Sequence, residues 1–391
     1  MAMLAAFASN YLFARMYGAA LFGELQYALS LAYIVGSAAL IFSAQSVSPI
    51  LGRHTLLRHL VFYSAFRLRL SVTVLVFVIF SGIVLLIIRP HSLELTLIAG
   101  LAMFAEPISL GALMAYVDSR PWIVTRAKAY ASSARVIWLY LAAHASLGAA
   151  VASIAWPIEA CVAAAAPFFR YRALAIAEPR HLRNSDAVKR ILIARGLKLW
   201  PAIAAGIFLL RIDRILLGSL ISKAELGVYA AAASLVEQWN MMGATLALAL
   251  APKLVFGMRS GAEIRRGALM LGTYLAALAV AGSIGNFFIG RYVFLAIYGH
   301  AFESGISILN VAMFCSVVVF ADSGFSAWLF AAKQYRMLLI KQILTVMAIV
   351  VSPFLFPRSY IQYSPSIGSA ASLALFWLVL IVKTHSRAVK K

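Results

Sequence analysis

The chain has 391 residues, of which 63% are hydrophobic and 12% are charged, and its mean hydropathy is +0.92. Soluble domains contain roughly 45–50% apolar and about 25% charged residues, so a soluble enzyme or binding domain is excluded. A bilayer crossing takes about 20 apolar residues, and a chain of this composition is therefore predicted to be an all-α integral membrane protein without a sizeable soluble domain.

Apolar runs separated by basic clusters predict about twelve transmembrane helices. The first six lie at about 1–18, 25–47, 69–88, 93–117, 128–146 and 148–169. The second six lie at about 199–220, 227–250, 267–290, 304–329, 337–357 and 366–383. The first 14 residues carry no charge, so we interpret 1–18 as a membrane helix rather than a cleaved signal peptide.

The longest polar stretch divides the chain into two lobes. Residues 1–169 form a predicted N-terminal six-helix lobe, 170–198 a basic cytoplasmic connector, and 199–391 a C-terminal six-helix lobe with a short basic cytoplasmic tail. An internal repeat fits this division, because the segment 22–31 resembles 226–235. Two such lobes around a central cavity are a known transporter plan.

A second match supports the repeat. Glu106 is followed by Arg120 fourteen residues later, and Asp322 is followed by Arg336 at the same spacing.

The net charge of +21 follows the positive-inside rule. If the N-terminus is cytoplasmic, 27 of the 34 lysines and arginines fall in inner segments and 7 at outer ends. This bias predicts that both termini are cytoplasmic, with an even number of helices. The bias accounts for the excess of basic over acidic residues, so no nucleic-acid partner is expected. The basic residues at the inner face also favour a bilayer containing anionic lipids.

Motifs of soluble enzymes are missing from the sequence, which contains no phosphate loop, nucleophile elbow or histidine pair at metal-binding spacing. The two cysteines, Cys161 and Cys315, lie in apolar runs. We therefore expect no catalytic residue, no metal and no cofactor.

Charged residues inside apolar helices are costly and commonly face a cavity or a partner. Arg211, Asp213 and Arg214 form the densest group, and they predict either an anion-attracting cavity wall or an internal Arg–Asp pair. Glu237 and Asn240 lie in the next helix, where an interhelical hydrogen-bond network is the simpler interpretation.

The matched acids Glu106 and Asp322 also lie within predicted helices. They are candidates for proton or cation carriers, or else partners of nearby basic residues.

The chain resembles a known family at several short motifs. These are Ile212–Gly218 followed by Glu225–Ala232, Ala14–Gly18 with Phe22-Gly23, Tyr298-Gly299 with Phe302, and Ile367–Ala371. They are similar to bacterial O-antigen and polysaccharide flippases of the Wzx type, in the multidrug/oligosaccharidyl-lipid/polysaccharide exporter superfamily. The chain departs from that pattern at Ala19, where a proline is expected, and it lacks a charged lead before the first helix.

The resemblance implies a transporter of the bacterial inner membrane. It would flip polyprenyl-pyrophosphate-linked oligosaccharide to the outer leaflet, with a polysaccharide polymerase and a chain-length regulator as further partners. The candidates for contact with the substrate are Arg211, Arg214, Arg15 and Asn240. The candidates for ion coupling are Asp213, Glu106, Asp322 and Glu237.

Three other functions remain open at this point. A multidrug exporter of the same superfamily would favour organic cations, which fit poorly with 13 acids against 34 bases. A membrane-embedded polysaccharide polymerase or glycosyltransferase usually has a long outer loop, and no predicted outer segment exceeds about 15 residues. A scaffold without transport activity is disfavoured by the intramembrane charges.

Overall fold

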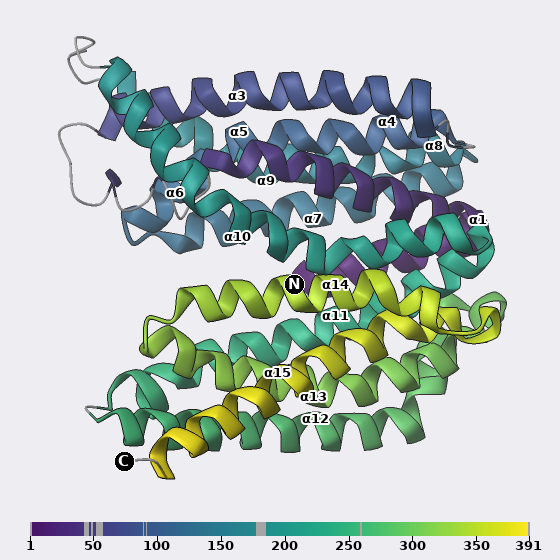
Figure 1. The fold of residues 1–391 in the computed structure, drawn as a ribbon. Coiled ribbons are helices and arrows are strands. Elements are labelled where there is room, and N and C mark those ends of the chain that lie inside the picture. Colours follow the sequence, from purple (N-terminus) through teal and green to yellow (C-terminus); the bar gives the residue numbers. More distant parts are fainter. Residues whose placement is uncertain are drawn as a thin grey trace. The chain divides into compact units, whose positions relative to one another are not determined.

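The computed structural model describes residues 2–42, 47, 50–51, 58–88, 90, 92–176, 185–258 and 260–389. These residues are almost entirely helical and contain no β-strand, which confirms the predicted all-α class (Figure 1). The chain divides into two compact units, Met1–Arg211 and Ile212–Lys391. The division falls within one long helix, α10 (Ser185–Leu220). The predicted cytoplasmic connector at 170–198 includes residues 177–184, which lie outside the described residues.

Unit 1 is built from the helices that precede α10 together with most of α10 itself. Its elements are α1 (Ala2–Gly36), η1 (Ser37–Phe42), α3 (Arg58–Ile83), η3 (Val84–Ile88), α4 (Leu93–Leu101), η4 (Ala102–Phe104), α5 (Ala105–Ile108), α6 (Leu110–Val117), α7 (Pro121–His144), α8 (Ala149–Ser153) and α9 (Ala155–Ile176). The segment from α4 to α6 matches the predicted span 93–117, and it is interrupted twice near Pro107 because proline cannot donate to the helical ladder.

Unit 2 begins in the last turns of α10. Its further elements are α11 (Lys223–Ala251), η6 (Pro252–Phe256), α12 (Gly261–Tyr298), η7 (His300–Phe302), α13 (Gly305–Ala331), α14 (Tyr335–Leu355), η8 (Arg358–Tyr363) and α15 (Ser364–Val389). Each of the second six predicted spans falls within one of the helices α10 to α15, apart from Ser304, the first residue of the span at 304–329, and the last two residues of the span at 337–357.

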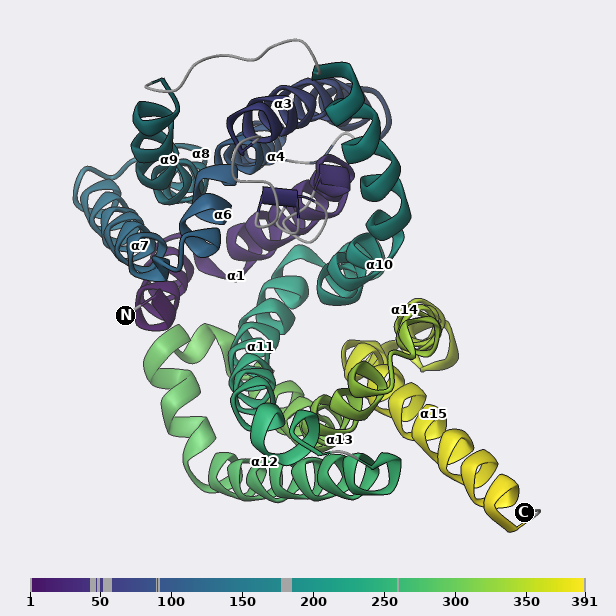
Figure 2. The ribbon, with the colours of Figure 1, turned by 90° about the vertical axis from the view of Figure 1, so that its left-hand side faces the viewer.

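Gly18 divides α1 into two helical segments. Its φ of 76° and ψ of 177° are not helical, and φ in this range favours glycine. Figure 2, which looks along the helices, shows the purple part of the chain as two separate rods. The two segments correspond to the separate spans predicted at 1–18 and 25–47.

Nine helical stretches in the described residues are long and apolar enough to cross a membrane, so the chain is a multi-pass membrane protein. One of the nine, Phe7–Phe42, includes the break at Gly18. Neither α7 nor α10 is among them. Twelve crossings therefore stay a prediction.

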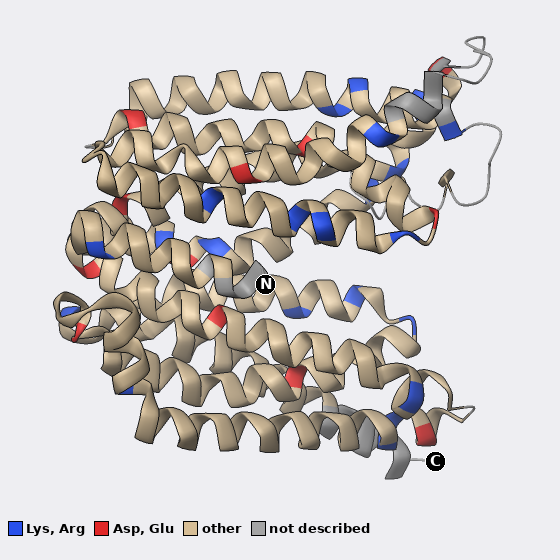
Figure 3. Ribbon diagram, turned by 180° about the vertical axis from the view of Figure 1, so that it is seen from behind, with Lys and Arg blue, Asp and Glu red and all other residues tan. Residues whose placement is uncertain are grey.

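Lysine and arginine gather mainly toward one end of the helices in each unit (Figure 3). This distribution is the one that the positive-inside rule describes. The orientation of the chain in the membrane stays a prediction.

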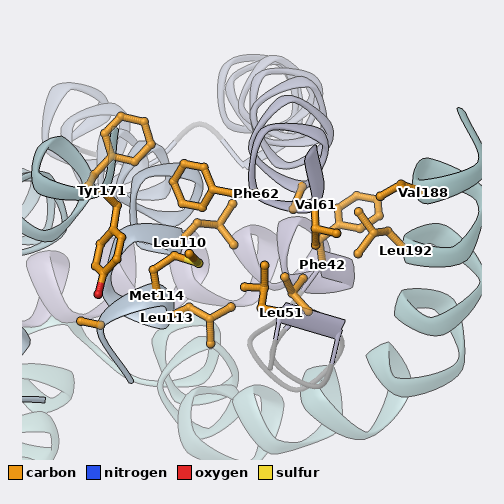
Figure 4. Packing of buried hydrophobic residues seen from close by; sticks show 14 of the residues in the cluster. Phe42, Leu51, Val61, Phe62, Leu110, Leu113, Met114, Tyr171, Val188 and Leu192 are labelled. Carbon is orange, nitrogen blue, oxygen red and sulfur yellow. The ribbon is translucent and has the colours of Figure 1, made fainter. Parts of the chain in front are cut away.

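At the end of unit 1 where α6 meets α7, a cluster of buried apolar side chains holds the helices together (Figure 4). Phe62 from α3, Leu110 from α6, Tyr171 from α9 and Leu192 from α10 all belong to it. A Cβ on Gly111 would lie 2.3 Å from the backbone of α9, so glycine permits the close approach of α6 and α9. This packing fixes the positions at which α7 begins and α9 ends.

Two positions of the predicted repeat have the same local structure. Ser30 Oγ donates to the carbonyl of Gln26 at 2.7 Å, and Ser234 Oγ donates to the carbonyl of Ala230 at 2.7 Å. All four residues belong to well-packed helices, α1 and α11.

The turns before α7 and α14 also match. Ser119 and Lys333 have φ values of 57° and 55°, which are uncommon for residues other than glycine. The amide of Arg120 donates to a carbonyl five residues earlier, and so does the amide of Gln334. The turn at Ser146 has the same pattern, with a φ of 50° and a bond from the Leu147 amide to the carbonyl of Ala142, so this is a common way to end a helix and the internal repeat stays a prediction.

Candidate functional site

The α10–α11 hairpin carries the most specific of the family-like motifs, and a capping box fixes its geometry. Ser222 is the N-cap of α11, and its amide donates to Glu225 Oε2 at 2.9 Å while the Glu225 amide donates back to Ser222 Oγ at 3.3 Å. The next turns contain glycine and alanine, and Leu226–Ala232 is buried throughout. The small side chains let neighbouring helices approach α11 closely.

Arg214 and Glu237 form an ion pair across this hairpin. Arg214 Nη2 lies 2.6 Å from Glu237 Oε1, and the arginine side chain is fully buried whereas that of Glu237 is 26% exposed. A buried guanidinium needs such a partner, because an unpaired charge in an apolar environment costs several kcal/mol. The pair therefore links α10 to α11 inside unit 2.

Asp213 and Asn240 lie on the same two helices as this ion pair. Tyr229 Oη donates to Asp213 Oδ2 at 2.6 Å. The other carboxylate oxygen, Asp213 Oδ1, and the side-chain oxygen of Asn240 are both buried without a hydrogen-bond partner among the described residues. Unit 2 thus contains two buried oxygen acceptors with unused hydrogen-bonding capacity.

Unit 1 contains a separate, mostly apolar cavity of about 260 Å³. Tyr33 and Ser37 line it from α1 and η1, and Glu106 lines it from α5. The Glu106 carboxylate has no hydrogen-bond or ion-pair partner within the ranges that the structure describes. Arg211 lies over the ring of Tyr33, with its Cζ atom 5.3 Å from the ring centroid. The cavity therefore combines one acidic group with a phenol that an arginine covers.

Arg69 on α3 supports the backbone around Glu106. Its side chain is buried, its Nε atom donates to the carbonyl of Phe42 at 2.6 Å, and its Nη1 atom donates to the carbonyl of Glu106 at 2.8 Å and to Ser109 Oγ at 3.0 Å. The interrupted helix at Pro107 leaves carbonyl groups without helical partners, and the arginine satisfies one of them.

Arg15, another predicted substrate contact, is exposed. Its Cζ atom lies 5.0 Å from the centroid of the Tyr11 ring, one helical turn earlier. This cation–π contact holds the guanidinium near the end of the first segment of α1 without burying it.

Asp322 is the acid that the repeat matches to Glu106, and it has basic and aromatic partners. Lys341 Nζ on α14 lies 2.6 Å from Oδ1 and 2.7 Å from Oδ2, and Trp377 Nε1 on α15 donates to Oδ1 at 2.7 Å. Lys341 is itself buried. These contacts join α13, α14 and α15. Asp322 is thus the partner of a nearby basic residue, which is one of the two roles that the sequence suggests for it.

Sequence reasoning missed a further ion pair in unit 1, between Arg135 on α7 and Glu159 on α9. Arg135 Nε also donates to Ser9 Oγ at 2.8 Å, and Ser132 Oγ donates to the carboxylate at 2.6 Å. The positive-inside rule assigns Arg135 to the inner segment at 120–135. Opposite charges on two consecutive predicted helices were the signal that could have identified the pair.

The structure brings some of the predicted site residues together and keeps others apart. Four belong to the α10–α11 hairpin of unit 2: Asp213, Arg214, Glu237 and Asn240. Two more lie at the unit 1 cavity. Glu106 lines it directly, and Arg211 contacts Tyr33, which lines it. In the described part of the chain, no group of three or more histidine, cysteine or acidic side chains could hold a metal ion.

Comparison with known proteins shows which solved structures share the fold of this chain. No family model matches the chain, and no curated protein matches it. A solved structure of the lipid II flippase MurJ in an inward closed conformation matches with a TM-score of 0.77 and 11% identity, covering 98% of this chain and 86% of that one.

Transporters of the multidrug resistance MATE family of the MOP superfamily also match. The inward-facing structure has a TM-score of 0.71 and 13% identity over 99% of this chain and 95% of that one. The outward-facing structure has a TM-score of 0.59 and 14% identity over 100% and 94%. At such low identity these matches show that the chain shares its fold with these transporters.

Proposed function

We propose that this chain, with its MOP-superfamily fold, is a flippase for polyprenyl-pyrophosphate-linked oligosaccharide in the bacterial inner membrane. The observation that carries the proposal is the match to the lipid II flippase MurJ over 98% of the chain. The Wzx-like motifs in the α10–α11 hairpin favour an anionic, lipid-linked substrate over a cationic one.

The physical task explains the need for polar groups inside the protein. The lipid tail can stay in the bilayer, but unpaired sugar hydroxyls and a pyrophosphate in hydrocarbon cost several kcal/mol each. Arg211 and Arg15 carry guanidinium groups that are not fully buried, and a guanidinium suits a pyrophosphate because it presents a planar fork of donors. Both are proposed to contact the substrate, with Asn240 as a polar contact in unit 2.

Arg214 is proposed to act differently from the other two arginines. Its burial and its ion pair with Glu237 suit a positioning role, in which it holds α10 on α11. In this proposal Glu237 balances Arg214 rather than carrying an ion, and Asp322 likewise balances Lys341.

The driving force is proposed to include the membrane potential. With an inside-negative potential, moving a pyrophosphate from the inner to the outer side is favourable by about 2.3 kcal/mol per charge per 100 mV. Asp213 and Glu106 remain the candidates for coupling to a proton or cation gradient, because Asp213 has an unpartnered buried oxygen and Glu106 faces a cavity. A polysaccharide polymerase and a chain-length regulator are proposed as partners on the family resemblance alone.

Conditional depletion of the gene tests this function in cells. Surface polysaccharide and lipid-linked oligosaccharide are measured on the same cells. Loss of the polymer with accumulation of complete repeat units facing the cytoplasm supports the flippase. Normal polymer without accumulation contradicts it, and accumulated units that already face outward would indicate a polymerase.

A second candidate is a multidrug exporter. The unit 1 cavity favours it, since an apolar pocket with one carboxylate, Glu106, could accept an organic cation, and the MATE transporters share the fold. Accumulation of a fluorescent organic cation on depletion, with unchanged surface polysaccharide, would identify this function instead.

A further inference from the structure

Trp122 lies at the start of α7 with two arginines over its ring. The Cζ atom of Arg126, one turn later on α7, is 4.9 Å from the ring centroid. The Cζ atom of Arg170, near the end of α9, is 5.7 Å from it. The ring is 47% exposed, and both arginines are exposed as well.

Two guanidinium groups that converge on one ring repel each other, and nearby acids do not neutralise them. The carboxylate of Asp118, in the turn before α7, is engaged by Arg58 at 3.1 Å and by Tyr171 Oη at 2.8 Å. Neither Arg126 nor Arg170 has an ion-pair partner within the described ranges. The pair of positive charges is therefore complementary to an anion.

Large apolar side chains lie next to these arginines. Phe169 precedes Arg170 and is 61% exposed, and Tyr130 is 73% exposed one turn beyond Arg126 on α7. One turn is about 5.4 Å along the axis, so the exposed face of α7 changes from a tryptophan through an arginine to a tyrosine within about 12 Å. Tryptophan and tyrosine with arginine are typical of the boundary between headgroups and acyl chains.

We propose that Trp122, Arg126 and Arg170 form a binding site for the headgroup of a resident anionic phospholipid. The two guanidinium groups would bind the phosphate, and the acyl chains would lie along Phe169 and Tyr130. The cation–π contacts hold both arginines in place before the lipid arrives, which lowers the entropic cost of binding. The site lies on the exposed surface of α7 and α9, and the proposal does not depend on the proposed transport function.

Brominated lipids test the site with both arginines in place. The full chain is reconstituted into phosphatidylcholine vesicles containing phosphatidylglycerol, with bromine on the acyl chains of one lipid or the other at equal mole fraction. We expect brominated phosphatidylglycerol to quench the emission of Trp122, taken as the difference between wild type and Trp122→Phe, more than brominated phosphatidylcholine does. Equal quenching by the two lipids would overturn the proposal.

Matched double variants separate a specific site from general surface charge. Arg126→Gln with Arg170→Gln should lower the affinity for phosphatidylglycerol by about 30-fold, since the bound phosphate loses both of the guanidinium groups that contact it. The control, Arg266→Gln with Arg336→Gln, removes the same charge from other predicted inner segments and should leave the affinity nearly unchanged. Equal weakening by both double variants, or displacement of the lipid by inorganic phosphate, would contradict a lipid site.

Discussion

Arg214 Nη2 lies 2.6 Å from Glu237 Oε1, and the Arg214 side chain is the largest fully buried one in the described part of the protein. The pair joins the two helices of the hairpin that carries the most family-like motif. A buried ion pair contributes little net stability, but removal of one partner is costly because the other charge stays buried.

Glu237→Gln should therefore destabilise the protein by about 3 kcal/mol, since the buried guanidinium of Arg214 loses its counter-charge. The measurement is the thermal unfolding midpoint in detergent. The double variant Arg214→Met with Glu237→Leu removes both charges and should recover most of the stability. If the double variant is stable but inactive in transport, Arg214 does more than position α10.

Tyr229→Phe and Asp213→Asn distinguish a structural from an ion-coupling role for Asp213. Tyr229→Phe deletes the donor to Asp213 and should cost about 1.5–3 kcal/mol, as expected for a hydrogen bond to a charged group. Asp213→Asn keeps an oxygen acceptor for the tyrosine, so stability should fall less. Loss of transport in the stable Asp213→Asn protein would support ion coupling, whereas full transport would remove Asp213 from the mechanism.

Two acids in unit 1 offer a matched comparison. Glu159→Gln should lower stability by about 3 kcal/mol because Arg135, which is buried, loses its partner. Glu106→Gln removes no hydrogen bond or ion pair of the described side chains, only the longer-range attraction between its carboxylate and Arg69, so it should cost less stability than Glu159→Gln and should reduce transport or its proton dependence. Unchanged transport at all pH values would show that Glu106 is not a carrier.

Gly18→Ala should destabilise the protein by about 1–3 kcal/mol, because φ 76° with ψ 177° is a backbone conformation that is essentially restricted to glycine. The Cβ itself meets nothing within 4 Å, so the cost comes from the backbone alone. Gly206→Ala is the control, since its Cβ also meets nothing and its backbone is helical. It should stabilise the protein by about 0.5–1 kcal/mol. Equal unfolding midpoints for the two variants would contradict this account of the turn.

Arg211→Ala should abolish or strongly reduce export while the protein still reaches the membrane. The arginine is partly exposed and lies over Tyr33, so its loss removes the proposed substrate contact and not a buried charge. Surface polysaccharide and membrane abundance of the protein are measured together. Unchanged surface polysaccharide would remove Arg211 from the mechanism.

Hydropathy and charge spacing predicted the all-α class and the positions of the helices, because the bilayer imposes the lengths of apolar runs. The apolar pattern also predicted separate spans at 1–18 and 25–47, and the structure has its break in α1 at Gly18. Partners of buried charges were harder to predict. The sequence places Asp213 beside Arg214, yet Asp213 accepts from Tyr229 and Arg214 pairs with Glu237.

The reason is geometric. Successive residues on a helix point about 100° apart, so a pair that is adjacent in the sequence does not share a face, and partners come from the neighbouring helix. Lys341 illustrates the same limit, because the positive-inside rule assigns it to the inner segment at 333–341, whereas it lies buried against Asp322. Helix packing decides these pairings, and a single sequence does not specify it.

Translocation by the purified protein tests the central claim most directly. The full chain is reconstituted into vesicles with a fluorescent polyprenyl-pyrophosphate-linked saccharide, and the label that moves from the cytoplasmic-side leaflet to the other is measured with and without a membrane potential. The account predicts transfer faster than in protein-free vesicles, accelerated by a potential that is negative on the cytoplasmic side. Transfer no faster than in protein-free vesicles, with uptake or release of an organic cation by the same protein, would contradict it.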